Sequence, residues 1–329
     1  MTMEEEHHIF QLSHSYWQSC VLHAAVRLDL FRKLGPSAMK VEEVAHLLKA
    51  DVRGISLLLN ALVTLDFLKK EGELFSLTIR SQKYLDDLSP QTMIHIVRHM
   101  INLYQYWGQL PQAVLTGKPV VDRNDREREQ VENFLWGMHD LARGAAPIIT
   151  RTLDLSSFKF LLDLGGGPAT YAIEFCRKNP KLQATIFDLP DTEPIAQENI
   201  KRNNLGHRIQ FVGGDFLKDI IPGRYDCVFL SHIVHGYSPD VNLSLLEKVY
   251  GAMYTGGQIV IQDFILDESK TRPKFAAIFA LNMLLHTEGG RSYTANEIEN
   301  WLTEAGFKDV EKIEVDLPNE AGLIRAVKG

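Results

Sequence analysis

The chain has 329 residues, of which 45% are hydrophobic and 23% are charged, a composition typical of a globular protein. Its net charge of −7 and isoelectric point near 6.0 provide no basic surface for nucleic acid or an anionic membrane. No apolar run approaches the roughly 18 residues of a membrane span, and the first residues are acidic where a signal peptide is basic, so we expect a cytoplasmic protein.

Cysteine and histidine spacing gives no sign of a metal centre. Cys20, Cys176 and Cys227 lie far apart, so the sequence predicts neither a disulfide framework nor a Cys-x-x-Cys site. His95 and His99 have the i, i+4 spacing that can place two ligands on one helix face, but no acid or cysteine accompanies them in a recognisable pattern. We therefore expect no metal.

Residues 9–34 begin the chain with apolar side chains at helical spacing, and Gly35-Pro36 ends the pattern. The spacing recurs over residues 41–48 and 55–67, and residues 68–77 resemble two short strands around a turn. Three helices followed by a hairpin predict a winged helix, which we assign to a first domain, residues 1–90.

A winged helix raises the alternative of a ligand-sensing transcription regulator. The third helix would then have to present basic or polar side chains to DNA, yet residues 54–65 contain no charged residue. A helix of this kind is suited to being covered by protein. We therefore expect this domain to form a homodimer interface rather than to bind nucleic acid.

Residues 91–150 are predicted to be helical and are rich in aromatic residues and methionine, most of which we expect to form helix core. We assign this region to a helical linker, and the resemblance described below implies that it also contributes to a substrate pocket. The polar run 122–129 within this region predicts a solvated loop or the start of a helix, and its four acids outweigh its three arginines, so it is not a nucleic-acid patch.

Residues 160–188 form a strand, a glycine loop, a helix and a second strand, the pattern of a nucleotide-binding half. A dinucleotide fold would have a third glycine where Thr170 stands, whereas here Asp163 precedes the run that begins at Gly165. Asp188 ends the second strand, where an acid can accept hydrogen bonds from ribose hydroxyls. The loop alone leaves the choice of nucleotide open.

The third domain, residues 151–329, alternates strands with helices from residue 160, and this predicts an α/β fold with a parallel sheet. Residues 308–315 and 321–327 break the alternation and predict an antiparallel C-terminal hairpin. The predicted strands are 160–164, 183–187, 208–212, 225–230 and 257–263, and the predicted helices are 169–178, 191–203, 240–254 and 294–305.

Six segments together resemble the caffeic acid and hydroxyindole O-methyltransferase family of class I methyltransferases, which use S-adenosyl-L-methionine (SAM). They are 161–167 (LLDLGGG), 187–190 (FDLP), 213–216 (GGDF), 230–235 (LSHIVH), 256–261 (GGQIVI) and 287–291 (TEGGR). The resemblance covers nearly the whole chain. It implies a Rossmann-like sheet with an antiparallel C-terminal hairpin, preceded by a winged-helix dimerisation domain, and methyl transfer to a hydroxyl of a small, aromatic molecule with S-adenosyl-L-homocysteine as product.

The resemblance also implies a set of cofactor-binding residues. Glycine allows the backbone to approach a ligand, a carboxylate can bind a diol, and an aromatic ring can cover a purine. In the family these groups contact the methionine part, the ribose and the adenine of SAM. The matching positions are Gly165, Gly167, Asp188, Leu189, Asp215 and Phe216, and Ser231 stands where the family commonly has a lysine.

His235 matches the family's general base, which accepts the proton of the acceptor hydroxyl. The two glutamates that orient this histidine in the family fall on Asp263 and Ser292, so the resemblance assigns one orienting acid, and Glu288 is a possible substitute for the second. His232 is expected to have a structural role. The implied acceptor pocket uses Phe134, Met138, Phe279, Met283 and Thr287.

Two alternatives to O-methylation stay open, because the chain departs from the family at Ser231 and Ser292 and because its first domain resembles a winged helix. A C- or N-methyltransferase of the same fold would work mainly by proximity and would not require His235. A ligand-sensing regulator would use the winged helix.

Overall fold

The computed structural model describes residues 3–121 and 127–329, which form two compact units with a boundary between Asn102 and Leu103. The predicted polar run 122–129 lies partly outside the described residues, and a helix begins at Arg128. Within the described part of the chain, no helix is both long and apolar enough to cross a membrane.

The first unit contains the predicted helices and hairpin. Helices α2 to α5 (residues 16–64) contribute apolar side chains to one core that includes the strand residue Phe75. The Asp51 side chain caps one of these helices by accepting the Gly54 N–H at 2.8 Å. Leu68 pairs with Leu77 across the hairpin, whose turn contains Gly72 with φ of +60°. The elements are α1 (Met3–His14), α2 (Tyr16–Arg27), α3 (Leu30–Leu34), α4 (Val41–Leu48), α5 (Val52–Thr64), β1 (Leu68–Glu71), β2 (Leu74–Leu77), α6 (Ile79–Tyr84) and α7 (Ile94–Trp107), which crosses the boundary.

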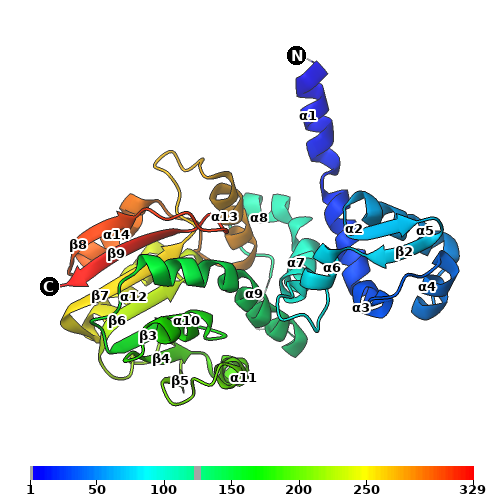
Figure 1. Cartoon of the computed structure of the whole chain (residues 1–329). Helices are drawn as coiled ribbons and strands as arrows, with labels where there is room; N and C mark the ends of the chain where they lie inside the picture. The colour runs from blue at the N-terminus through cyan, green and yellow to red at the C-terminus, as the bar shows by residue number, and fades with distance from the viewer. Residues whose placement is uncertain (1–2, 122–126) are drawn as a thin grey trace. The chain divides into compact units, whose positions relative to one another are not determined.

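Helix α1 exposes apolar side chains that its own unit does not cover. In Figure 1 it extends away from the other helices of the first unit, and Ile9, Phe10 and Leu12 are each more than 60% exposed. Trp17 at the start of α2 continues this surface with 58% exposure. Contiguous exposed apolar residues are typical of a surface that another protein covers.

The second unit contains a seven-stranded sheet in the order β5-β4-β3-β6-β7-β9-β8, with β5 and β8 at its edges (Figure 1). The first five of these strands are parallel, and β9 pairs antiparallel with both β7 and β8, so the predicted sheet and C-terminal hairpin are confirmed. The strands are β3 (Phe160–Leu164), β4 (Gln183–Asp188), β5 (Ile209–Gly213), β6 (Tyr225–Ser231), β7 (Met253–Asp263), β8 (Phe307–Ile313) and β9 (Gly322–Lys328).

Helices cover both faces of this sheet because alternate strand residues point to opposite sides. Leu161 of β3 belongs to a core formed with α9, α10 and α11, whereas Leu162 and Leu164 belong to a core formed with α12 and α14. The helices of this unit are α8 (Leu110–Thr116), α9 (Arg128–Thr152), α10 (Thr170–Lys178), α11 (Glu193–Arg202), α12 (Pro239–Gly251), α13 (Lys274–His286) and α14 (Ala295–Glu304).

Helix α13 was not among the predicted elements. Residues 275–285 are apolar on almost every side, so they show no helical periodicity that a sequence pattern could detect. The helix packs against α8, and it carries Phe279 and Met283 of the predicted acceptor pocket.

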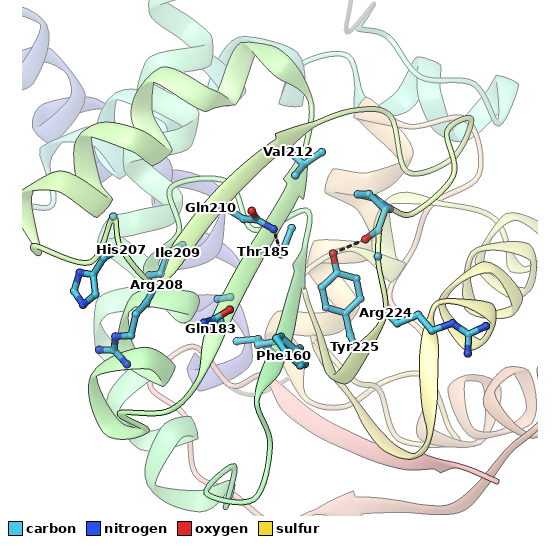
Figure 2. A pocket seen from close by; sticks show the side chains of 15 residues that line it. Phe160, Gln183, Thr185, His207, Arg208, Ile209, Gln210, Val212, Arg224 and Tyr225 are labelled. Atoms are coloured by element: carbon cyan, nitrogen blue, oxygen red, sulfur yellow. Dashed lines mark hydrogen bonds between the residues drawn. The ribbon is translucent and has the colours of Figure 1, made fainter.

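A pocket of about 440 Å³ lies where the parallel strands β3, β4, β5 and β6 begin, opposite to their carboxyl ends (Figure 2). It exists because the connection between β5 and β6, residues 214–224, contains no helix to cover this face. Figure 2 shows Gln210 donating to Thr185 and Tyr225 donating to the carbonyl of Pro222. Ligands of parallel α/β sheets bind at the opposite, carboxyl edge, so this pocket is not the candidate site.

Candidate active site

The glycine loop at the end of β3 has a conformation that requires glycine. Gly165 has φ of +68°, and a Cβ there would lie 2.4 Å from Cδ1 of Ile233. Gly167 has φ of +46° with more open surroundings. The Gly165 N–H donates to the carbonyl of Phe187 at 2.9 Å, which ties the loop to the end of β4. The loop therefore presents bare backbone at the carboxyl edge of the sheet.

Asp188 closes this loop from the end of β4. One carboxylate oxygen accepts the Gly167 N–H at 2.7 Å and the other accepts the Leu189 N–H at 2.7 Å. Burial raises the pKa of Asp188, and the two backbone hydrogen bonds oppose that shift. Leu189 is half exposed beside it. The structure thus brings Gly167 together with Asp188, which lies 21 positions later in the sequence.

Asp163 lies beneath the loop and is almost completely buried. One oxygen accepts the Ala172 N–H at 3.2 Å, and the other has no hydrogen-bond partner among the described residues. Burial raises the pKa of Asp163 to about 7. Any side chain at Gly166 would collide with this carboxyl group, since a Cβ there would lie 2.6 Å from its carbon.

Asp215 and Phe216, from the loop after β5, differ in how they meet the glycine loop. Phe216 is buried, with a ring carbon 3.5 Å from where a Cβ on Gly165 would lie. The Asp215 carboxylate pairs with Lys218 at 2.8 Å and accepts the Leu217 N–H at 3.0 Å, and the bond from Lys218 lowers its pKa. Its side chain is therefore engaged within its own turn.

Ser231 lies at the end of β6. Its hydroxyl donates to Oε1 of Gln262 at 3.0 Å.

His235 and Asp263 are joined by a short polar contact at the ends of β6 and β7. Nδ1 of His235 lies 2.7 Å from Oδ1 of Asp263, and the backbone N–H of His235 donates to Oδ2 of the same carboxylate at 3.2 Å. Asp263 is buried at the end of β7. Burial alone would raise its pKa, but the charge and hydrogen bond of His235, with a smaller contribution from the nearby His232, outweigh burial and lower it.

His232 is the second histidine beside Asp263, with its Nδ1 atom 3.8 Å from Oδ1. Potential ligand atoms of His232, His235 and Asp263 lie within 4.8 Å of one another. The 2.7 Å between His235 and Asp263 is a hydrogen-bond length, whereas two ligands of one tetrahedral zinc ion lie roughly 3.3 Å apart for bonds near 2.0 Å. The spacing therefore favours a hydrogen bond between His235 and Asp263 over the binding of one metal ion by both residues.

Glu288 and Ser292 are the two other positions that the family resemblance suggested for orienting His235. Glu288 is exposed and forms no hydrogen bond or ion pair with any described residue. Ser292 is buried, and its hydroxyl donates to the carbonyl of Ala276 at 2.7 Å. The structure therefore brings Asp263 to His235 but not Glu288.

Aromatic rings surround the imidazole of His235. Phe279 meets it edge to face with ring centroids 4.9 Å apart, and Phe264 stacks at 6.1 Å. Phe279 also contacts Phe264 and Phe275, so α13 and the residue after β7 together form an apolar wall. Met283 is buried one turn further along α13.

Thr287 ends this wall. Gly290, three residues later, was not predicted to belong to the site. The Thr287 hydroxyl donates to the carbonyl of Met283 at 2.7 Å and accepts the Gly290 N–H at 3.0 Å. A Cβ on Gly290 would lie 2.3 Å from the carbonyl oxygen of His235, so only glycine allows this loop to pack on the histidine backbone. The GG pair at 289–290 was the available signal.

Phe134 and Met138 lie half buried on α9. Between them, Leu135 is buried and its Cδ2 atom lies 3.7 Å from where a Cβ on Gly167 would be. Asn282 on α13, which no sequence pattern singled out, has a buried side-chain oxygen without a hydrogen-bond partner among the described residues.

Two family models match the chain. The O-methyltransferase domain matches residues 107–308, and the O-methyltransferase dimerisation domain matches residues 10–87. The chain belongs to the O-methyltransferase family. The fold class and the enzyme class predicted from the sequence are thereby confirmed.

Known members of the O-methyltransferase family extend the match over the whole chain. Tetracenomycin polyketide synthesis 8-O-methyl transferase TcmO of Streptomyces glaucescens is 30% identical and aligns over 96% of both sequences. The crystal structure of human N-acetylserotonin methyltransferase in complex with SAM has a TM-score of 0.89 and 27% identity over 100% of this chain and 99% of that one. PigF of Serratia, solved with S-adenosylhomocysteine, has a TM-score of 0.90 and 26% identity over 100% of both chains. The O-methyltransferase family uses SAM, which confirms the predicted cofactor class.

Proposed function

We propose that this enzyme transfers the methyl group of SAM to a hydroxyl oxygen of a small aromatic molecule, with His235 as general base. The observation that carries the proposal is the 2.7 Å hydrogen bond between His235 and the buried Asp263, at the sheet edge that also holds the glycine loop. Three features support it: the cofactor cradle, the tautomer of His235 and the apolar wall.

The glycine loop and Asp188, which form the proposed cofactor cradle, offer the hydrogen-bonding capacity that SAM requires. Each oxygen of Asp188 accepts one backbone N–H and retains capacity for a further donor, as a ribose diol requires. We assign Gly165 and Gly167 to the close approach of the backbone to the methionine part of SAM, and Leu189 and Phe216 to contacts with the adenine. Asp215 and Ser231 are assigned to the rim of the SAM site. Bound SAM supplies an electrophilic methyl group on a positively charged sulfur.

The Asp263 carboxylate determines which nitrogen of His235 can act as a base. Asp263 can only accept when it is ionised, so the proton of His235 lies on Nδ1 and Nε2 carries a lone pair. That lone pair would accept the proton of the acceptor hydroxyl as the hydroxyl oxygen takes the methyl group, with the methyl–sulfur bond of SAM breaking to leave S-adenosyl-L-homocysteine. Asp263 then stabilises the imidazolium. Glu288 has no place in this arrangement.

The acceptor is proposed to be aromatic because of the apolar wall. We assign Phe279, Met283 and Thr287, with Phe134 and Met138 on α9, to a flat ring bearing the hydroxyl. The names of TcmO and of N-acetylserotonin methyltransferase indicate polyketide and indole acceptors for those proteins, both ring systems.

We further propose a homodimer formed through the first unit, with the exposed apolar residues of α1 against the partner. The domain limits 1–90, 91–150 and 151–329, the cytoplasmic location and the absence of a metal requirement stay predictions.

Incubation with methyl-labelled SAM and a panel of phenols tests the proposed function. Label recovered on oxygen, and lost with His235→Ala, supports it. Label transferred to carbon or nitrogen, at a rate that His235→Ala leaves unchanged, supports the alternative methyltransferase. Specific binding of upstream DNA without transfer to any acceptor supports a regulator.

A further inference from the structure

The backbone of His232 has a conformation that the proposed reaction leaves unexplained. It follows β6 with φ of +58°, a left-handed conformation that non-glycine residues rarely adopt. Its N–H donates to the carbonyl of Gln262 at 2.8 Å, which fixes the turn to the penultimate residue of β7. The ring packs 4.5 Å from Phe264 and 5.9 Å from His235 between centroids. A strained residue held this firmly beside a functional group indicates a constraint on where its side chain points.

Asn319 defines the tautomer of that ring. It lies in the turn between β8 and β9, where its side-chain oxygen accepts the Ala321 N–H at 3.4 Å. This contact assigns the amide nitrogen to the side that faces Nε2 of His232 at 3.2 Å. An amide nitrogen only donates, so Nε2 is the acceptor and the proton of the neutral ring lies on Nδ1.

The Asp263 carboxylate is the acceptor that lies near the Nδ1 proton of His232. Nδ1 is buried and has no hydrogen-bond partner among the described residues, and Oδ1 of Asp263 lies 3.8 Å away. That distance is too long for a hydrogen bond, but a movement of about 1 Å would form one. Because a buried N–H without an acceptor is unfavourable, this movement is favoured.

We propose that His232, held by Asn319, is a positioning residue that anchors the Asp263 carboxylate and, through it, the imidazole of His235. The inference rests on the proposed role of His235. Oδ1 of Asp263 also accepts the Phe264 N–H at 2.7 Å, so the anchored carboxylate has donors on three sides and cannot rotate away from His235. A base held at one angle samples the productive geometry more often.

The electrostatics of Asp263 agree with this arrangement. Burial opposes ionisation of Asp263, but His235 and, to a smaller extent, His232 lower its pKa. Burial raises the pKa of Tyr293 to about 12, and Asp263 adds to that increase.

Histidine-labelled NMR spectra test the tautomer directly. In the wild-type protein at neutral pH, we expect the ¹⁵N shifts of His232 to indicate the Nδ1–H tautomer, and in Asn319→Leu a mixture of both tautomers. The low-field proton of the His235–Asp263 hydrogen bond should shift or broaden in His232→Phe, which keeps the ring against Phe264 but removes the donor. His207→Phe, an exposed histidine at the opposite sheet edge, is the matched control.

Kinetics provide the second readout. His232→Phe and Asn319→Leu should each lower kcat about two- to tenfold, the rate equivalent of one neutral hydrogen bond, with KM for SAM unchanged. His232→Asn should recover part of the loss, because asparagine tolerates a left-handed backbone and keeps an N–H donor.

An Nε2–H tautomer of His232 in the wild-type protein overturns the inference, as does an unchanged low-field proton and kcat in a folded His232→Phe or Asn319→Leu protein. A different result separates the two proposals. If the low-field proton responds to His232→Phe but His235→Ala barely affects kcat, the anchoring of Asp263 is supported and the base role of His235 is wrong.

Discussion

Asp263 contacts His235 twice, through Nδ1 of the ring at 2.7 Å and through the backbone N–H at 3.2 Å. One buried carboxylate therefore fixes both the position of this residue and the nitrogen that carries its proton. Residues 28 positions apart in the sequence meet because β6 and β7 are parallel neighbours that end at the same edge of the sheet.

Replacing His235 by alanine should lower kcat about 10²–10⁴-fold, the usual contribution of a general base, and leave SAM binding nearly unchanged. Part of the loss should return at high pH, where a phenolic acceptor ionises without help. Steady-state kinetics from pH 6 to 10 with the identified acceptor provide the measurement. A loss below tenfold would show that the enzyme works by positioning alone.

Asp263→Asn and Glu288→Gln should have unequal effects on kcat. Asparagine keeps the shape of Asp263 but removes the charge that stabilises the imidazolium, so we expect a loss of tenfold or more. Glu288 is exposed and forms no hydrogen bond or ion pair with described residues, so Glu288→Gln should stay within about twofold of wild type and serves as the matched control. Equal losses in the two variants would remove Asp263 from its orienting role.

Asp188→Ala should weaken SAM binding by about 1.5–3 kcal/mol, the contribution of hydrogen bonds to a charged group. Asp191→Ala, an exposed acid three residues later, is the control and should bind as wild type. Calorimetric titration with SAM measures both. In thermal melts, SAM and S-adenosylhomocysteine should stabilise the wild-type protein, by about 2.7 kcal/mol at 100 times Kd, and NAD should not. Stabilisation by NAD alone would contradict the cofactor assignment.

Asp163 should make the protein less stable as the pH rises. Its folded-state pKa of about 7 lies above the ordinary value of 3.8, so the folded state holds a proton that the unfolded chain releases between roughly pH 4 and 7. The free energy of unfolding should fall across this window by up to about 1.4 kcal/mol per pH unit. Asp163→Asn removes this dependence, so the variant should gain stability relative to wild type from pH 5 to pH 8 in urea unfolding. An identical difference at both pH values would be inconsistent with the raised pKa.

A charge on α1 should dissociate the proposed dimer without unfolding the chain. Leu12 is 63% exposed in the single chain, so Leu12→Glu costs little folding free energy but becomes an unpaired charge once a partner covers it. Light scattering at micromolar concentration should give twice the 37.3 kDa chain mass for wild type and a single chain mass for Leu12→Glu. Ile220→Glu, at an 89% exposed position of the second unit, should remain dimeric. A monomeric wild-type protein would refute the dimer.

The sequence determined the elements whose patterns are local. Parallel strands were predictable because each is a short apolar run bounded by turn residues, and the glycine loop because Gly165 must adopt a positive φ. Helix α13 was not predictable, since an almost continuously apolar segment acquires its secondary structure from the neighbours it packs against rather than from its own period.

The sequence could nominate residues for the site, but not their pairing. The family resemblance offered both Asp263 and Glu288 as partners of His235, and of these two the fold places Asp263 within hydrogen-bond distance, at 2.7 Å. His232 and Asn319 are 87 residues apart, and their contact exists only because the C-terminal hairpin packs beside β7. Sequence periodicity specifies which side chains share a face, whereas the directions of individual polar groups depend on tertiary packing.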